Sequence, residues 1–290
     1  MDKLKNRLLS GLLAITMILT GMPGLNGIMV ANAAEDMQEI NIPNVYLKKL
    51  INITLEKDQD APVTREEMES LTVLNDKKLE HIEGGSKLQT FGISDLTGLE
   101  YAVNLEELVL ERNEITDLTP ICELPKLKKL NVNRNELVDI SPLSKMKNLE
   151  WLDIYNNKIE NIKPLSNLTN LKFLDMHYVN RQKKEIDIKP LANLTNLEYL
   201  SIESNLIHNI DCLKPVIESG NLKTILLRVN YITDFSLLKS MLNEYYIDKG
   251  GLESGEDNPV GTYGQRYDGE TVEVTAKSEG GAGQSRPPED

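Results

Sequence analysis

A segment of 22 residues recurs along the middle of the chain and constrains its fold more than any other feature. The clearest copies are LEELVLERNEITDLTPICELPK at 105–126, LKKLNVNRNELVDISPLSKMKN at 127–148 and LEWLDIYNNKIENIKPLSNLTN at 149–170. Self-similarity at a fixed period of roughly 20 to 50 residues is typical of proteins in which each repeat stacks only on its neighbours. The period therefore predicts an elongated solenoid with one continuous core.

Three more copies begin at Leu171, Leu197 and Leu222, and the first two of these carry extra residues around 181–185 and 217–220. A weaker copy precedes residue 105, because apolar residues stand 22 positions ahead of those in the first clear copy: Leu88, Ile93, Leu96, Leu99 and Ala102. We therefore expect six full repeats and one degenerate repeat.

Each copy follows the pattern L-x-x-L-x-L-x-x-N-x-I-x-x-I-x-P-L. Apolar residues that alternate at period two indicate a short strand with one buried face. The return segment is short and contains a proline, which favours 3₁₀ turns. This position holds Pro120, Pro142, Pro164 and Pro190, and Cys212 in the fifth copy. The predicted fold class is an α/β solenoid, a horseshoe with a parallel concave β-sheet, an irregular 3₁₀ convex side and a helical amino-terminal cap.

An asparagine follows the strand in most copies, at the point where the chain turns inward. A side-chain amide carries both a donor and an acceptor, so it can satisfy backbone groups of neighbouring coils that would otherwise be buried without partners. We interpret these residues as a structural ladder rather than a binding site: Asn113, Asn135, Asn157, Asn205 and Asn230.

The sequences that flank the repeats have the character of caps, which a solenoid needs because its terminal coils leave their cores open. Residues 45–55 have helical spacing, and Thr64 with Glu67 forms a capping box that opens a second helix. The expected organisation is a signal peptide at 1–33, a helical cap at 34–78, a repeat domain with its carboxy-terminal cap at 79–247, and an acidic, glycine-rich flexible tail at 248–290. The beginning of a further β-domain is the alternative for the tail.

The amino terminus has the form of a secretory signal peptide. Three basic residues precede an apolar run at 8–19, and Ala31-Asn32-Ala33 matches a small-residue cleavage site. The run is shorter than the roughly 20 residues that span a bilayer. We expect cleavage after Ala33, a secreted protein with no membrane insertion after cleavage, and non-covalent association with the cell surface as an alternative.

The cysteines and the net charge narrow the function. Cys122 and Cys212 lie in different repeats, about 19 Å apart at roughly 4.8 Å per strand, which is too far for a disulfide. The formal net charge of -13 argues against a nucleic-acid partner, because binding to phosphates depends on an excess of Lys and Arg. We expect no disulfide within the chain, two buried structural thiols and no nucleic-acid partner.

Several strings in the repeats are very similar to one known family. These are LTGLEYAVNLEEL, NEITDLTPI and the segments PLSNLTNLKFL at 164–174 and PLANLTNLEYL at 190–200. They resemble the internalin-like leucine-rich-repeat proteins that Gram-positive bacteria export, and the resemblance covers about 40–247. It implies a leucine-rich-repeat fold and a role in adhesion and recognition of host proteins. No wall-sorting signal and no complete immunoglobulin-like module follow the repeats, so both release and surface retention stay open.

The residues between the leucines are expected to point outward from the concave sheet in three lateral rows, with neighbours about 4.8 Å apart. The first row is Glu107, Lys129, Trp151, Phe173, Tyr199 and Thr224. The second is Val109, Asn131, Asp153, Asp175, Ser201 and Leu226. The third is Glu111, Asn133, Tyr155, His177, Glu203 and Arg228, with Tyr178 just beyond it.

These rows place the only tryptophan of an aromatic-poor chain beside Phe173 and Tyr199. Exposed Trp and Tyr are enriched where protein interfaces bind most tightly, although rings on a sheet also simply cover one another. Asp153, Asp175 and Glu203 give the patch an acidic side, which favours a partner with exposed Lys or Arg. The predicted ligand-binding residues are Trp151, Asp153, Tyr155, Phe173, Asp175, His177, Tyr178, Tyr199 and Glu203.

An imidazole beside two carboxylates also invites an enzymatic reading, or cation binding by the two aspartates. No nucleophile motif, phosphate loop or metal-ligand spacing accompanies them, so we expect neither catalysis nor a metal or cofactor. The predicted function is recognition of an extracellular protein, or of a glycan, by a monomer. The alternative is a structural or accessory role in a secreted or cell-surface assembly, without a concave-face ligand.

Overall fold

A computed structural model of the chain describes residues 38–80, 91–181, 184–232, 234 and 236–238, together with strands at 245–249 and 272–276. The predicted signal peptide at 1–33 and most of the predicted tail at 248–290 lie outside these residues. Within them, no helix combines the length and the apolar character needed to cross a bilayer.

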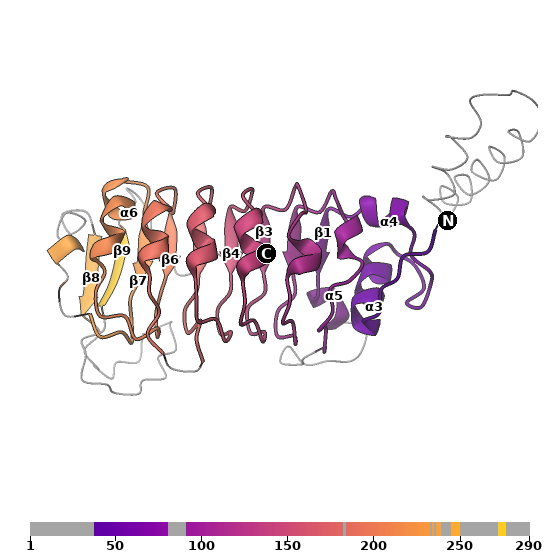
Figure 1. Cartoon of the computed structure of the whole chain (residues 1–290), viewed down its shortest axis with the longest axis horizontal. Coiled ribbons are helices and arrows are strands. Elements are labelled where there is room, and N and C mark those ends of the chain that lie inside the picture. The colour runs from indigo at the N-terminus through magenta and orange to yellow at the C-terminus, as the bar shows by residue number, and fades with distance from the viewer. Residues whose placement is uncertain are drawn as a thin grey trace, which may run out of the picture.

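Short parallel strands stacked in sequence order form one sheet along the molecule (Figure 1). They are β1 Val73–Asn75, β2 Glu107–Val109, β3 Lys129–Asn131, β4 Trp151–Asp153, β5 Phe173–Asp175, β6 Tyr199–Ser201 and β7 Thr224–Leu226. From β2 to β7, each full repeat supplies one strand, as the period predicts. The expected solenoid with a parallel sheet is confirmed.

Helical turns line the opposite side of the molecule (Figure 1). The 3₁₀ helices are η1 Leu99–Tyr101, η2 Thr119–Ile121, η3 Ser141–Lys145, η4 Lys163–Asn167, η5 Lys189–Asn193, η6 Asp211–Leu213 and η7 Ser236–Leu238, and one α-helix, α6 Lys214–Glu218, follows η6. A proline stands at the start of η2, η3, η4 and η5, where its missing N–H costs nothing. The prediction of 3₁₀ turns is thereby confirmed.

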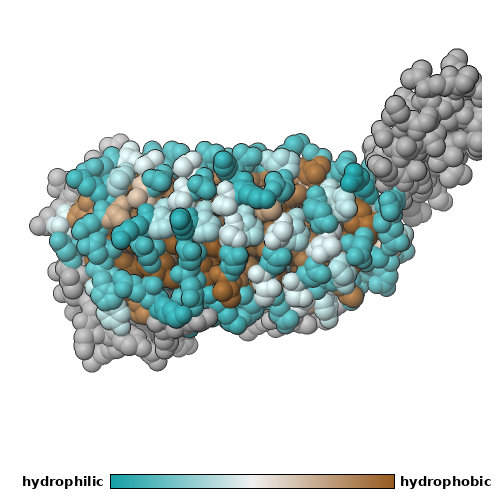
Figure 2. Space-filling view, in the orientation of Figure 1, coloured by the Kyte–Doolittle hydropathy of each residue, from teal (hydrophilic) through white to brown (hydrophobic). Residues whose placement is uncertain are grey.

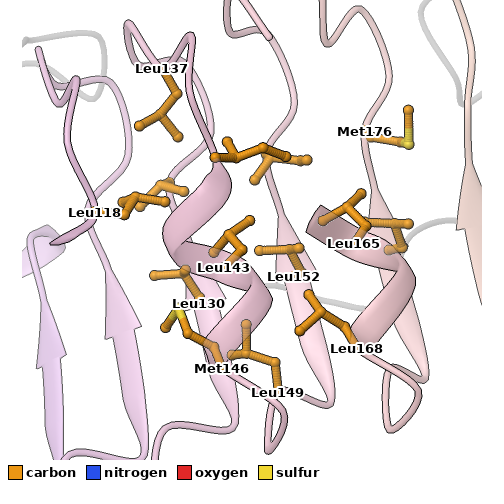
Figure 3. Packing of buried hydrophobic residues seen from close by; sticks show 14 of the residues in the cluster. Leu118, Leu130, Leu137, Leu143, Met146, Leu149, Leu152, Leu165, Leu168 and Met176 are labelled. Carbon is orange, nitrogen blue, oxygen red and sulfur yellow. The ribbon is translucent and has the colours of Figure 1, made fainter. Parts of the chain in front are cut away.

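The repeated leucines pack into one core between the sheet and the helical turns. Leu130 and Leu152 from neighbouring strands meet Leu143 and Leu165 from the return segments, and all four are fully buried (Figure 3). Complete burial of such a side chain stabilises the fold by roughly 1.5 to 3 kcal/mol. Hydrophilic residues cover much of the face in Figure 2, with apolar residues visible between them.

The amino-terminal cap contains α3 Val45–Thr54, α4 Arg65–Glu69 and α5 Lys77–Glu80. The Asn44 side chain accepts the Leu47 N–H at 2.9 Å and starts α3, and the predicted capping box of Thr64 and Glu67 starts α4. Because α3 packs against β1 and α5, it covers the end of the core. Gly98 allows this cap to approach closely, since a Cβ there would lie 2.8 Å from Ile42.

The first strand differs from the expected repeat boundaries. β1 lies inside the range 34–78 that we expected to be a helical cap, and Val73 pairs with Glu107, which is a spacing longer than 22 residues. The apolar residues Ile93, Leu96 and Leu99 do enter the core, whereas Leu88 lies outside the described residues. The degenerate repeat is therefore longer than the sequence pattern indicated.

Two antiparallel strands complete the carboxy-terminal edge of the sheet. β9 Val272–Ala276 pairs with β7, and β8 Tyr245–Lys249 pairs with β9. Unpaired N–H and C=O groups on an edge strand favour such additions. β9 lies within the range 248–290 that we expected to be a flexible tail, so this part of the range forms a strand instead.

The predicted asparagine ladder is present and buried. The Oδ1 atom of Asn157 accepts the N–H of Leu137 at 3.0 Å, and its Nδ2 atom donates to the carbonyls of Val132 and Ile154 at 3.2 and 2.9 Å. The same kind of link to the preceding coil is made by Asn113, Asn135, Asn205 and Asn230. Each amide thus ties two coils together.

The fourth repeat has Val179 where the other repeats have the ladder asparagine. Its backbone carbonyl takes over and accepts the Ile159 N–H at 3.0 Å. The Arg181 side chain, in the inserted residues that follow, donates to the carbonyls of Asn157 and Asn135 at 3.1 and 2.6 Å. The insertion therefore adds a different link between coils, because Arg181 bonds to other carbonyls than a ladder asparagine at position 179 would reach.

A second asparagine ladder, which sequence analysis missed, runs along the exposed side of the coils just before the strands. Asn148 donates to the Pro125 carbonyl at 2.7 Å, and Asn170 donates to the Lys147 carbonyl at 2.9 Å. Equivalent bonds are made by Asn104, Asn196 and Asn221. In the sequence each of these residues stands directly before the first leucine of a repeat, as in the NLTNL strings that contain Asn170 and Asn196, so a periodic signal for them existed.

Candidate functional site: the concave surface

The three lateral rows have the register that the repeat period predicts. Trp151 is paired with Phe173 and Phe173 with Tyr199, while Asp153 is paired with Asp175. The third row continues the register beyond the strands, since the N–H of Arg134 bonds to the Tyr155 carbonyl and that of Asn156 to the His177 carbonyl. The predicted neighbours are therefore neighbours in the fold.

The aromatic residues of the first row form one continuous stack. The rings of Trp151 and Phe173 lie 4.5 Å apart and 5° from parallel, and those of Phe173 and Tyr199 lie 4.4 Å apart and 8° from parallel. Lys129 Nζ lies 5.2 Å from the centroid of the Trp151 ring and is also paired with Glu107 at 3.1 Å. The cation therefore closes one end of the stack.

Burial differs along this stack. Trp151 is half-buried, whereas Phe173 and Tyr199 are only 5% and 9% exposed. Mutual covering, one of the two interpretations that the sequence left open, thus accounts for much of the inner two rings. Trp151 is the member of the stack with the most surface to offer a partner.

A second stack lies in the third row. The Tyr155 and His177 rings are 4.0 Å apart, and the Arg134 guanidinium lies 5.1 Å from the centre of the Tyr155 ring. Arg134 also donates to the Tyr155 hydroxyl from Nε at 3.1 Å and from Nη2 at 2.7 Å. All three side chains are half-buried, so this stack reaches the surface.

The two aspartates of the second row are buried rather than exposed. Asp153 is 0% exposed, accepts the Tyr155 N–H at 3.0 Å and accepts from Asn133 Nδ2 at 2.9 Å. Asp175 is 3% exposed and accepts the His177 N–H at 3.1 Å, with His177 Nδ1 3.4 Å away. Both carboxylates shape the backbone bend after the strand, which weakens the interpretation of an acidic docking patch.

The remaining predicted residues are Tyr178 and Glu203, and both are half-buried. Glu203 lies 3.9 Å from Arg228 Nε. Tyr178 has a backbone φ of +50°, and the equivalent position has positive φ in all six repeats: Arg112, Arg134, Asn156, Tyr178, Ser204 and Val229. The left-handed backbone at this position bends the chain where it leaves the strand. The bend recurs at the same point of every full repeat.

Sequence analysis missed Arg134 as a member of the site. It stands directly before a ladder asparagine and outside the three alternating rows, so period-two reading assigned it to a turn. The signal that could have found it is Arg112, the matching arginine before the ladder asparagine of the preceding repeat.

Two hollows in the described part of the chain lie outside the concave rows. One of about 530 Å³ is lined on the flank and convex side by residues of the fourth and fifth repeats, including Asp187, Asp211 and Cys212. Burial, followed by the charge of Asp187, raises the pKa of the Cys212 thiol. Cys122 and Cys212 are both free thiols, with Cys122 buried.

The acidic groups at the centre of the concave surface accept hydrogen bonds from within the fold. In the described ranges, no group of three or more His, Cys, Asp or Glu side chains has the arrangement to hold a metal ion. The nearby carboxylates of Asp153 and Asp175 accept hydrogen bonds from backbone N–H groups, and that of Asp153 also accepts one from the Asn133 side chain. What the surface offers is aromatic rings and guanidinium groups.

Comparison with known proteins agrees with this description. The family model described as Leucine Rich repeats (2 copies) matches residues 103–145 and 147–187. An internalin (inlF) structure from Listeria monocytogenes is 31% identical with a TM-score of 0.58, and the match covers 68% of this chain and 53% of that one. Internalin C2 (inlC2) from the same organism is 26% identical with a TM-score of 0.51, over 71% of this chain and 95% of that one.

The chain is therefore an internalin-like leucine-rich-repeat protein. It spans about half the length of the first of these structures. Comparison with curated protein sequences gives no match.

Proposed function

We propose that this protein is an extracellular recognition module that binds a partner protein on its concave surface, with Trp151 and Tyr155 as the main contacts. The observation that carries the proposal is a pair of aromatic stacks, one that begins at half-buried Trp151 on the strands and one that begins at half-buried Tyr155 just beyond them. Partly exposed Trp, Tyr and Arg residues, held in place by their neighbours, have the composition of interface hot spots. The fold supports a binding role rather than a catalytic one.

The stacking favours a protein over a glycan. A sugar that packs on an aromatic ring needs an open ring face, but Lys129 and Phe173 both lie against the Trp151 ring. Ring edges and the indole N–H remain, and these suit backbone carbonyls and side chains of a protein. A partner protein therefore fits this surface better.

The secreted location and the monomeric state are part of the same proposal. The support for export is the sequence at 1–33 and the likeness to Listeria internalins. A structural role in a surface assembly is the competing function, and it would use the flanks of the solenoid instead of the concave rows.

The test is capture of partners from pools of extracellular proteins and glycans by the parent protein and two variants. The first variant, Trp151→Ala with Tyr155→Ala, removes the half-buried ring at the start of each stack. The matched control is Tyr231→Ala, because Tyr231 is 38% exposed and stacks on His208 outside the concave rows.

We expect the double variant to lose capture of a protein while the control retains it. Unfolding midpoints of all three proteins establish that the variants are folded. Equal capture by a folded double variant would refute a concave binding site and favour the accessory role.

A further inference from the structure

The carboxylates of the concave surface are all engaged by neighbouring groups. Their partners are Lys129 for Glu107 at 3.1 Å, Asn131 for Glu111 at 2.5 Å, Asn133 for Asp153 at 2.9 Å, the His177 N–H for Asp175 at 3.1 Å and Arg228 for Glu203 at 3.9 Å. Hydrogen bonding and ion pairing leave these groups little to gain from a cation on a partner. The carboxylates of the acidic side expected from the sequence are therefore hydrogen-bonded or ion-paired within the fold.

Arg134, which stacks on Tyr155 of this surface, and Arg112, at the equivalent position one repeat earlier, are in the opposite situation. Arg112 and Arg134 occupy matching left-handed corners of successive repeats, with φ of +52° and +54°. In the part of the chain that the structure describes, neither has a carboxylate within ion-pair distance, whereas Arg181 and Arg228 each have one. Both side chains are half-buried, so part of the cost of removing water from them on binding has already been met in folding.

Arg134 is also held in position before any partner arrives. Its Nε and Nη2 atoms donate to the Tyr155 hydroxyl, and its plane lies near the ring. These bonds leave further guanidinium N–H groups and the hydroxyl hydrogen of Tyr155 as donors. A fixed guanidinium loses less conformational entropy on binding a carboxylate than a mobile lysine does.

We propose that Arg112, Arg134 and Tyr155 receive an acidic segment of the partner protein, with side-chain carboxylates placed on the two guanidinium groups. This inference rests on the proposed function and names the chemistry of the partner. It reverses the polarity that the sequence suggested, because the carboxylates of Asp153 and Asp175 are buried and Arg112 and Arg134 have no carboxylate partner among the described residues. Successive coils set the two arginines about one strand spacing apart, roughly 4.8 Å, which suits neighbouring carboxylates.

The experiment is an NMR titration of the full chain with tetraglutamate, tetraglutamine and tetralysine peptides, following the arginine Nε–H signals. A salt concentration of about 0.15 M limits the influence of distant charges, since the screening length is then about 8 Å. This screening matters because the chain has a net charge of -13.

Two charge-matched variants make the result specific. Arg112→Gln with Arg134→Gln removes the proposed site, and Lys163→Gln with Lys189→Gln removes the same charge from exposed positions at the starts of η4 and η5. Circular dichroism and unfolding midpoints verify that both are folded.

We expect tetraglutamate to shift the Arg134 Nε–H signal and to bind at least tenfold more weakly to the arginine variant, with the lysine variant unchanged. Tighter binding of tetralysine, or equal tetraglutamate binding by the arginine variant, would overturn the inference. A further result is that the arginine variant retains protein capture while the Trp151→Ala, Tyr155→Ala variant loses it. That result would overturn the preference for an acidic segment and leave the concave binding site standing. Capture retained by both variants overturns the docking surface as well.

Discussion

Trp151 and Phe173, which are 22 residues apart in sequence, stack with ring centroids 4.5 Å apart and planes only 5° from parallel. The contact joins two successive coils on the outside of the sheet, whereas the leucines join the same coils on the inside. Because Tyr199 covers the other face of Phe173, the middle ring of the stack is buried between two neighbours, and Trp151 at the end keeps the most exposed surface. One row of side chains therefore links three coils, and the proposed contact residue Trp151 stands at its end.

Phe173→Ala should lower the free energy of unfolding by about 3 kcal/mol, because it removes a buried ring and two stacking contacts. Trp151→Ala should cost less, since Trp151 is half-buried and has one ring neighbour in the first row. Urea unfolding followed by circular dichroism measures both. A smaller loss for Phe173→Ala than for Trp151→Ala would contradict the assignment of roles.

Asn157→Ala should lower the free energy of unfolding by about 3 kcal/mol, because the Leu137 N–H and two buried carbonyls lose their partner. The control is Asn170→Ala on the exposed ladder, where one bond to the Lys147 carbonyl is lost and water can replace it. Its expected cost is below about 1 kcal/mol. Thermal unfolding of the two variants side by side makes the comparison, and equal losses would argue against the buried ladder.

Val229→Gly should raise the free energy of unfolding by roughly 0.5 to 1 kcal/mol, because a β-branched residue is strained at its φ of +56°. Val138→Gly is the control. Val138 is likewise an exposed valine, at 52%, but is not among the residues with positive φ, so this change should destabilise the protein. Unfolding midpoints report the sign, and a loss of stability in both variants would show that the left-handed corner is not strained.

Acid should destabilise the flank between the second and fourth repeats through Glu136. Its hydrogen bond with Lys158, and then that with Arg181, lowers the pKa of this carboxyl from 4.5. A lowered folded pKa gives stability that is present above the unfolded pKa and is lost as the pH falls through the folded value. Glu136→Gln should therefore flatten the decline in stability below about pH 4.5, as followed by urea unfolding across pH.

Glu114→Gln is the control for this pH dependence, because Glu114 is an exposed carboxyl on the preceding repeat. Its acid limb should match that of the parent protein. A Glu136→Gln variant with an unchanged acid limb would mean that the Lys158 and Arg181 contacts do not persist in solution.

The strands and their lateral rows could be predicted because two periods are visible in the sequence at once. Period two gives the buried face, and period 22 gives the register that places Trp151 beside Phe173. The position of β1 could not be predicted, since the segment between Val73 and Glu107 does not keep that period.

The chemistry of the site was harder to predict than its location. The sequence does not distinguish an aspartate that faces a partner from one that accepts a hydrogen bond from the backbone two residues ahead. Asp153 belongs to the second kind, because it accepts the Tyr155 N–H. Which of the two roles the carboxylate has depends on the backbone bend that follows the strand. Arg134 was missed for the same reason, because its left-handed backbone returns its side chain to the next repeat.

One rim of the sheet carries charges that alternate from coil to coil, in the order Glu106, Lys128, Glu150, Lys172, Glu198 and Lys223. Lys128 pairs with Glu106, Lys172 with Glu150 and Lys223 with Glu198, and Lys172 lowers the pKa of the Glu150 carboxyl.

Exposed pairs of this kind add little stability singly. Their alternation nevertheless means that a change by an odd number of coils differs from a change by an even number. Deleting or duplicating a single coil would bring like charges side by side, while gaining or losing coils in twos would preserve every pairing. A change of length by two coils is therefore the one that keeps this charge pattern intact.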